Sequence, residues 1–261
     1  MVVYWLEQIE ADVPADQNWL SSSELLRLDA MPFARRRNDW RLGRWTAKNA
    51  WTACRNLPVD SQVLREIEIR PASTGVPKLF FKNHPVNVTI SLSHRAGSAI
   101  CAVAPAPGTL GCDLELVEAR SDAFLTDYFT AEEQALVSRA PESDRPWIVA
   151  LLWSAKESAL KALGEGLRLD TRSVIVNPAD VLRQGSEATE PSAESFSTEL
   201  GSSTSPNGWF PLSVRHTAGQ IYQGWWQHKG VLVRTIVASP PPNLPILLAP
   251  RSRYSSVNQY G

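Results

Sequence analysis

The stretch from Trp153 to Gly166, WSAKESALKALGEG, constrains the fold of this 261-residue chain more than any other. Its alanine, leucine, glutamate and lysine residues favour helix, and glycines follow where a helix would end. With the apolar residues before it, the stretch predicts a helix over residues 146–163. Trp153, Glu157 and Lys161 recur at every fourth residue and therefore share one face of that helix. Taken alone, this pattern is more typical of an ion pair on a solvated face than of a functional site.

A second acidic element lies upstream, at residues 111–117. In its sequence, GCDLELV, apolar and acidic residues alternate, which predicts a half-buried strand. Asp113 and Glu115 would then point to the same face, about 7 Å apart along the strand. Neighbouring carboxylates repel each other unless a cation lies between them, and Mg²⁺ is commonly held by carboxylates, waters and substrate phosphates. Together with Glu157, these two residues predict a three-carboxylate metal site.

Basic and polar residues nearer the N-terminus are candidate phosphate ligands. A helix predicted over residues 33–56 carries Arg44 and Lys48 on one face, and arginine suits bidentate contacts with oxyanions. Ser93 and His94 lie at the end of the first strand of a predicted hairpin. A serine hydroxyl and an imidazole N–H at such a strand end can both donate to a phosphate. For each residue the alternative is structural: a solvated basic face, or a histidine that only supports the turn.

The rest of the chain reads mostly as strands with short helices. Two capping boxes, in which Ser or Thr is followed three residues later by Glu, predict helix starts at Ser21 and Thr130. Residues 118–128 predict a polar loop, and the Ser-, Thr-, Glu- and Pro-rich residues 184–208 predict a flexible excursion. Strands are predicted over residues 2–9, 63–70, 86–93, 98–104 and 110–117, and in the later segments SVIVNP, WFPLSVRH, IYQGWWQH and VLVRTIVAS.

Composition argues against several classes of protein. The net charge of −1 gives no global reason to expect a nucleic-acid or membrane partner, and the apolar run at 146–153 is too short to span a bilayer. The N-terminal sequence lacks the basic region of a signal peptide. Three cysteines without paired spacing do not suggest a disulfide framework. We therefore expect a cytoplasmic protein.

These motifs carry a family resemblance. GCDLE followed by WSAKESALK resembles the paired signature of the 4′-phosphopantetheinyl transferases, of the larger, surfactin-synthetase-activating type with two similar halves in one chain. The segment ISLSH at 90–94 is similar to the Ser-His phosphate loop of that family, and Arg44 to its N-terminal coenzyme-binding arginine. Phe129-Thr130-x-x-Glu133 resembles the segment that leads into the helix of the second half.

The resemblance implies an α+β fold. Two similar halves, related by a pseudo-twofold axis, would each consist of a small antiparallel sheet packed with helices, in a monomeric protein. A Pro- and Gly-rich break at 105–108 sets the expected halves at residues 1–107 and 108–240, followed by a tail at 241–261 for which no order is predicted. The sequence itself shows no evident internal repeat.

The resemblance also implies an activity. The enzyme would be a holo-[acyl-carrier-protein] synthase that transfers the 4′-phosphopantetheine arm of coenzyme A to a serine of an apo acyl or peptidyl carrier protein. Adenosine 3′,5′-bisphosphate would be released. Asp113, Glu115 and Glu157 would hold Mg²⁺, with Mn²⁺ as a possible substitute. Glu157 would also act as the general base.

Phosphate contacts are implied for a further set of residues. Lys161 would reach the phosphates from the helix of the second half and take part in catalysis. From the first half the contacts would come from Arg44, Lys48, Ser93 and His94.

The chain departs from the family pattern at one turn. Between Gly and Pro, where the family often has a basic residue, it has Val76, so Lys78 is the substitute we expect. The neighbouring Lys156 is a weaker candidate for orienting the serine nucleophile. Phe124, Leu125 or Tyr128 in the predicted polar loop would contact the carrier.

Two other functions use the same residues. A metal-dependent nucleotide pyrophosphate hydrolase would need the carboxylates but no carrier. A non-catalytic module that binds coenzyme A or a carrier would not need a base, so Glu157 and Lys161 argue against it.

Overall fold

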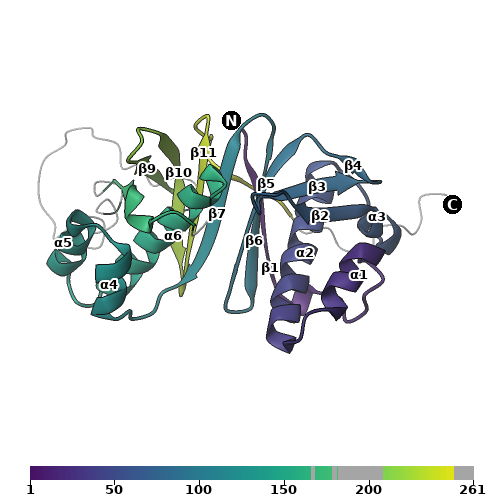
Figure 1. Cartoon of the computed structure of the whole chain (residues 1–261), viewed down its shortest axis with the longest axis horizontal. Coiled ribbons are helices and arrows are strands. Elements are labelled where there is room, and N and C mark those ends of the chain that lie inside the picture. Colours follow the sequence, from purple (N-terminus) through teal and green to yellow (C-terminus); the bar gives the residue numbers. More distant parts are fainter. Residues whose placement is uncertain (166–167, 178–180, 182–207, 250–261) are drawn as a thin grey trace, which may run out of the picture.

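The computed structural model describes residues 1–165, 168–177, 181 and 208–249. The chain has an α+β fold in which antiparallel sheets are packed with helices (Figure 1). This confirms the fold class expected from the sequence. Most of the expected 184–208 excursion lies outside the described residues.

The first half of the chain is organised around a four-stranded sheet. Its order is β12-β1-β6-β5, in which β1 pairs antiparallel with β6 and parallel with β12. A smaller sheet, β2-β3-β4, lies beside it, and the long helix α2 packs on β1, β5 and β6. The strands are β1 (Tyr4–Ile9), β2 (Ile67–Pro71), β3 (Pro77–Phe81), β4 (His84–Pro85), β5 (Val88–Arg95), β6 (Ser98–Pro105) and β12 (Ile246–Leu247), and the helices are α1 (Ser22–Asp29), α2 (Ala34–Cys54) and α3 (Ser61–Glu66).

The second half repeats this plan with a five-stranded sheet. Its order is β7-β11-β10-β9-β8, and the long helix α6 packs mainly on β7 and β11. The strands are β7 (Thr109–Leu116), β8 (Val174–Val176), β9 (Phe210–His216), β10 (Ile221–Lys229) and β11 (Leu232–Ser239), and the helices are α4 (Asp122–Tyr128), α5 (Ala131–Arg139) and α6 (Arg145–Leu163).

The two halves share one strand connectivity. In each, a first strand is followed by a long helix and then by a hairpin whose second strand pairs with the first strand. The result is the order β1-β6-β5 in one half and β7-β11-β10 in the other. Strand β1 therefore corresponds to β7, β5 to β10, β6 to β11, and helix α2 to α6. Figure 1 shows each long helix lying against the sheet of its own half.

The halves meet where β5 and β6 lie beside β7 (Figure 1). The Ser91 hydroxyl on β5 accepts a hydrogen bond of 2.9 Å from the backbone N–H of Cys112 on β7. An apolar core is shared across this seam and contains Trp5, Cys112 and Trp209. Side chains of both halves therefore face one another along β5 and β7.

A glycine permits the close packing of α6 on β7. A Cβ atom on Gly111 would lie 1.8 Å from the carbonyl oxygen of Ser158, which is impossible without moving the helix. The glycine of the GCDLE motif thus lets α6 approach the acidic strand directly. The helix ends at Gly164, whose φ of 78° is the left-handed conformation that glycine favours.

Two of the sequence predictions were wrong in detail. The strand predicted over residues 63–70 is helix α3 followed by β2, because the Asp60 side chain accepts from the backbone N–H of Val63 and starts a short helix. The polar loop predicted over 118–128 contains helix α4, which begins after the capping residue Ser121. In the expected tail, β12 adds a short parallel strand to β1.

Both predicted capping boxes are present. Ser21 with Glu24 starts α1, and Thr130 with Glu133 starts α5. The three cysteines are free thiols, and burial raises the pKa of Cys112 to about 11. Among the helices of the described ranges, none combines the length and apolarity that crossing a membrane requires.

Candidate active site

The acidic strand β7 and the helix α6 bring their polar faces together. The indole Nε1 of Trp153 donates to Glu115 Oε1 at 3.1 Å. Two turns later on the helix, Lys161 Nζ lies 2.7 Å from Asp113 Oδ1 and 3.1 Å from the carbonyl oxygen of Cys112. The helix face predicted from the spacing of Trp153, Glu157 and Lys161 therefore lies against the acidic face of β7.

Each of the three carboxylates has one buried oxygen without a hydrogen-bond partner. These are Asp113 Oδ2, Glu115 Oε2 and Glu157 Oε1. A buried carboxylate oxygen is unfavourable unless a donor or cation compensates it. Asp113 Oδ2 and Glu157 Oε1 therefore fit a hard divalent cation such as Mg²⁺, which takes oxygen ligands, while Glu115 Oε2 also has two arginines within ion-pair distance. Within the described residues, however, no group of three or more His, Cys, Asp or Glu side chains is already arranged to hold a metal ion.

The pKa shifts reflect how closely these acids are placed. Burial and, to a smaller extent, the charge of Asp113 together raise the pKa of Glu115 to about 7, against the opposing charges of Arg95 and Arg120. Burial and the charge of Asp113 also raise the pKa of Glu157. Asp113 thus acts electrostatically on both glutamates. A raised pKa makes the Glu157 carboxylate a stronger proton acceptor than an exposed glutamate, which suits a general base.

Lys161 is the cation nearest these acids on α6. Burial lowers its pKa, but the charges of Asp113, Cys112 and Glu157 outweigh burial, so that the pKa is raised overall. The ammonium group is therefore charged at neutral pH. Its side chain retains 25% exposure, so it can still reach a ligand.

Two arginines that the sequence analysis did not single out surround Glu115. Arg95 Nε lies 3.5 Å and Arg120 Nη2 3.6 Å from Glu115 Oε2, and both arginines also pair with Glu118. Arg95 directly follows His94, and Arg120 lies in the segment predicted as a polar loop. Nothing in the local sequence around either arginine predicts a contact with Glu115. Glu115 is therefore partly compensated by protein charges, whereas no arginine is paired with Glu157 in the described residues.

A cavity of about 470 Å³ lies beside the acidic cluster, at the seam between the halves. Arg44 and Trp40 line it from α2, His94 from β5, and Lys161 from α6. The guanidinium of Arg44 lies over the Trp40 ring, 4.8 Å from its centroid. Burial lowers the pKa of Arg44 to about 10, against the charge of Glu24, so the group stays cationic. The cavity is large enough for a small-molecule ligand, and its charged lining consists of Arg27, Arg44 and Lys161 with the acids Asp39 and Glu165.

His94 lies on the wall of the cavity, whereas the side chain of Ser93 is directed to the acidic cluster. His94 lines the cavity, and the loss of water around its ring lowers its pKa, against the charge of Asp39. The ring is therefore mostly neutral at physiological pH and has one N–H to donate. Ser93 Oγ instead donates to Asp113 Oδ1 at 2.7 Å, so its role in the structure is to hold that carboxylate.

Three lysines singled out from the sequence lie away from the cavity. Lys48 is fully buried and does not line it, because its ammonium is bound by Glu24 and by two backbone carbonyls. Lys78 is exposed on β3, and the cavity wall at this turn is formed by Val76. Lys156 is fully buried as well, so it cannot orient a nucleophile by contact. The burial of Lys48 corrects its expected phosphate contact, whereas the expected contact of the exposed Lys78 stays a prediction.

Comparison with known proteins bears on this site. The model of the 4′-phosphopantetheinyl transferase superfamily matches residues 109–205. The chain is also 27% identical over 178 residues to the 4′-phosphopantetheinyl transferase HetI of Nostoc sp. (strain PCC 7120), which covers 67% of this chain and 73% of that protein. The family match includes the acidic strand β7 and helix α6, and thus all three carboxylates and Lys161.

Proposed function

Because the chain belongs to the 4′-phosphopantetheinyl transferase superfamily, we propose that it modifies an apo acyl or peptidyl carrier protein. It would transfer the 4′-phosphopantetheine arm of coenzyme A to a carrier serine and release adenosine 3′,5′-bisphosphate. The observation that carries this proposal is the set of buried carboxylate oxygens without a hydrogen-bond partner on Asp113, Glu115 and Glu157, near a cavity lined by Arg44, His94 and Lys161. Such a site pairs metal-binding acids with cations for phosphates.

Asp113, Glu115 and Glu157 are the residues that would hold a divalent cation, Mg²⁺ or Mn²⁺. When bound, the cation would neutralise the diphosphate of coenzyme A and stabilise the leaving phosphate oxygen. Ser93 and Lys161 both contact Asp113 Oδ1, which leaves Asp113 Oδ2 as the free oxygen.

The cations of the cavity bind and orient the anionic substrate. Arg44 presents a planar guanidinium, which can make two parallel hydrogen bonds to a phosphate group. His94 adds one N–H, and Lys161 adds an ammonium from the opposite wall, next to the acids. Coenzyme A would therefore lie across the seam, with its diphosphate near Lys161.

Glu157 is the proposed general base. In the transfer, the serine oxygen forms a bond to phosphorus, the bond between that phosphorus and the bisphosphate oxygen breaks, and the serine proton passes to Glu157. The buried environment that raises the pKa of Glu157 makes its carboxylate a better proton acceptor than an exposed glutamate.

A mass-shift assay tests the function. The protein is incubated with coenzyme A, Mg²⁺ and an apo carrier, and the carrier is analysed by intact mass spectrometry. Gain of the phosphopantetheine mass on the carrier serine, with release of adenosine 3′,5′-bisphosphate, is the expected result. Carriers of fatty-acid, polyketide and peptide synthesis are tested in parallel, since the site does not choose among them.

Two outcomes would contradict the proposal. Cleavage of coenzyme A without carrier modification would support a pyrophosphate hydrolase. Binding of carrier or coenzyme A without any turnover, at several metal concentrations, would support a non-catalytic module.

A further inference from the structure

The corresponding helices α2 and α6 contain the same short sequence motif at equivalent positions of the two halves. Residues 45–48 of α2 read Trp-Thr-Ala-Lys, and residues 153–156 of α6 read Trp-Ser-Ala-Lys. The repeat is too short to stand out in the sequence. It is significant because both copies lie on the long helix that packs against the sheet of its own half.

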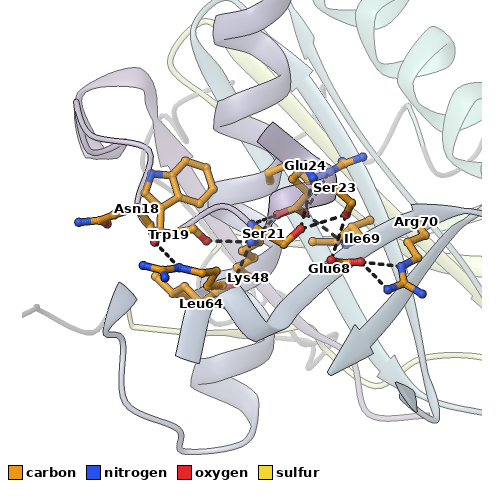
Figure 2. A network of polar contacts seen from close by, with 12 residues as sticks. Asn18, Trp19, Ser21, Ser23, Glu24, Lys48, Leu64, Glu68, Ile69 and Arg70 are labelled. Atoms are coloured by element: carbon orange, nitrogen blue, oxygen red, sulfur yellow. Dashed lines mark hydrogen bonds and ion pairs between the residues drawn. The ribbon is translucent and has the colours of Figure 1, made fainter. Parts of the chain in front are cut away.

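The lysine of the first copy is the centre of a buried polar cluster. Lys48 has no exposed surface, and its Nζ donates to Glu24 Oε2 at 2.6 Å and to the carbonyl oxygens of Trp19 at 2.9 Å and Leu64 at 2.8 Å. Figure 2 shows these residues converging from three segments of the first half. Glu24 is also the capping-box residue of α1, where it accepts from the backbone N–H of Ser21. The pair thus joins α1 to α2.

The lysine of the second copy is held in the same way. Lys156 has no exposed surface, and its Nζ lies 2.8 Å from Glu133 Oε2 and donates to the carbonyl oxygens of Thr171 and Val174. Glu133 is the capping-box residue of α5 and accepts from the backbone N–H of Thr130 at 2.9 Å. The pair thus joins α5 to α6.

Smaller details of the two clusters also agree. Lys48 lies over the ring of Trp19 and Lys156 over the ring of Phe129, at 5.5 and 5.7 Å from the ring centroids. The capping glutamate accepts from a strand N–H in both halves, from Ile69 for Glu24 and from Val176 for Glu133.

The next residue along each helix distinguishes the halves. After Lys48 comes Asn49, whose amide donates to the carbonyl oxygen of Trp45 within its own helix at 2.8 Å. After Lys156 comes Glu157, whose carboxylate has a buried oxygen without a hydrogen-bond partner and lies within electrostatic reach of Asp113. The lysine–glutamate cluster is present in both halves, but only the second half has a proposed reacting carboxylate next to it. We therefore do not assign the reaction to the cluster itself.

Helix geometry connects the cluster to Glu157. Successive residues of an α-helix point about 100° apart around its axis, so fixing the direction of Lys156 fixes that of Glu157. On the other flank of Glu157, the hydroxyls of Ser154 and Ser158 lie 2.9 and 2.7 Å from Thr235 Oγ1 on β11. In α2 the corresponding Thr46 hydroxyl donates to Leu42 of its own helix. Helix α6 is thus held on both sides of Glu157.

We propose that the buried pair of Lys156 and Glu133 is a positioning device, which sets the rotation of α6 so that Glu157 meets Asp113. The pair of Lys48 and Glu24 is its counterpart in the half that carries no metal-binding acids. This inference rests on the proposed metal site, and it predicts that breaking the two pairs destabilises both halves but disturbs metal binding only through the second.

The test compares two matched double variants of the full chain. In Lys156→Met with Glu133→Gln, and in Lys48→Met with Glu24→Gln, both charges are removed at similar side-chain size, and glutamine can still cap its helix. Mn²⁺ affinity is measured by electron paramagnetic resonance without coenzyme A or carrier, and folding is measured by circular dichroism and thermal unfolding. We expect Mn²⁺ binding to weaken about 10- to 100-fold in the first variant only, as for other residues that orient metal ligands.

A milder pair of substitutions keeps the test decisive if a double variant does not fold. Glu133→Asp and Glu24→Asp retain the charge and shorten the carboxylate, and only Glu133→Asp is expected to weaken Mn²⁺ binding. Equal Mn²⁺ affinities in the matched variants, or no Mn²⁺ binding by the unsubstituted protein, would overturn the inference. Because Mn²⁺ binding is measured without substrate, a failure of carrier modification is observed separately, in the mass-shift assay.

Discussion

The two halves of the molecule present opposite charges to the seam between them. The first half lines the cavity with Arg44 and His94, whereas the second half lines it with Lys161, which is ion-paired to Asp113 of the acidic cluster behind the cavity wall. Both halves are built from the same strand order and the same helix-anchoring cluster. The difference between them therefore lies in a few side chains on a common scaffold. It suggests that the first half supplies affinity for an anionic substrate and the second half supplies the chemistry.

The largest expected effect comes from the proposed base. Glu157→Gln keeps the size of the side chain and removes its charge, so carrier modification at saturating coenzyme A and metal should slow about 10²- to 10⁴-fold. Single-turnover mass spectrometry measures this rate. The fold should be retained, since the substitution removes a buried charge. Unimpaired transfer by this variant would remove Glu157 from the mechanism.

The matching change in the first half should affect binding instead. Arg44→Met keeps an unbranched side chain next to Trp40 but removes the guanidinium that lies over its ring, which should raise the KM for coenzyme A about 10- to 100-fold with a smaller change in kcat. Steady-state kinetics with coenzyme A as the varied substrate separates the two parameters. If kcat falls as much as for Glu157→Gln, the division of roles between the halves is wrong.

The closely spaced acids of the second half should make the free energy of unfolding depend on pH. Because burial and Asp113 raise the pKa of Glu115 to about 7 in the folded protein, the folded state binds more protons than the unfolded state between the ordinary glutamate pKa and 7. Without divalent metal, stability should therefore fall as pH rises through that window, by at most about 1.4 kcal/mol per pH unit from this group.

Urea unfolding in the presence of a chelator, at a series of pH values, measures this slope. The control is Glu115→Gln, in which the contribution is absent and the slope should be smaller. Equal slopes for the two proteins would mean that Glu115 has an ordinary pKa. No comparable control is needed in the first half, where Arg44 stays charged throughout this range.

Local patterns were sufficient to predict much of this site. The spacing of Trp153, Glu157 and Lys161 depends only on helix geometry, and the alternation around Asp113 depends only on strand geometry. Both capping boxes are equally local, since each joins residues three apart. Segments of this kind fold as their own sequence dictates.

The errors arose where a distant partner decides the outcome. A basic helix face suggested that Lys48 contacts phosphate, but its partner Glu24 and the carbonyl oxygens of Trp19 and Leu64 draw it into the core. Likewise, Arg95 at the end of β5 and Arg120 after β7 reach Glu115, although their local sequence gives no reason to expect the contact. The repeat of the anchoring cluster also depends on contacts between separate segments, so it is visible only in three dimensions.

The smallest expected effect concerns the turn where this chain departs from the family pattern. Val76 lines the cavity at a position between Gly75 and Pro77, and no arginine or lysine of this turn reaches the cavity in the described structure. If the first half supplies affinity through cations, Val76→Lys should lower the KM for coenzyme A about two- to five-fold without raising kcat, since a partly exposed ion pair contributes about 0.5–1 kcal/mol.

Steady-state kinetics at two salt concentrations test this, with Val76→Met as the control for size. The gain should shrink at high salt, because screening weakens exposed charge pairs. A lower KM in both variants would indicate apolar packing against coenzyme A rather than charge. In that case the first half would bind coenzyme A partly through apolar packing. The two halves would then differ in which one carries the reacting groups, and less in the charge of the residues that bind the substrate.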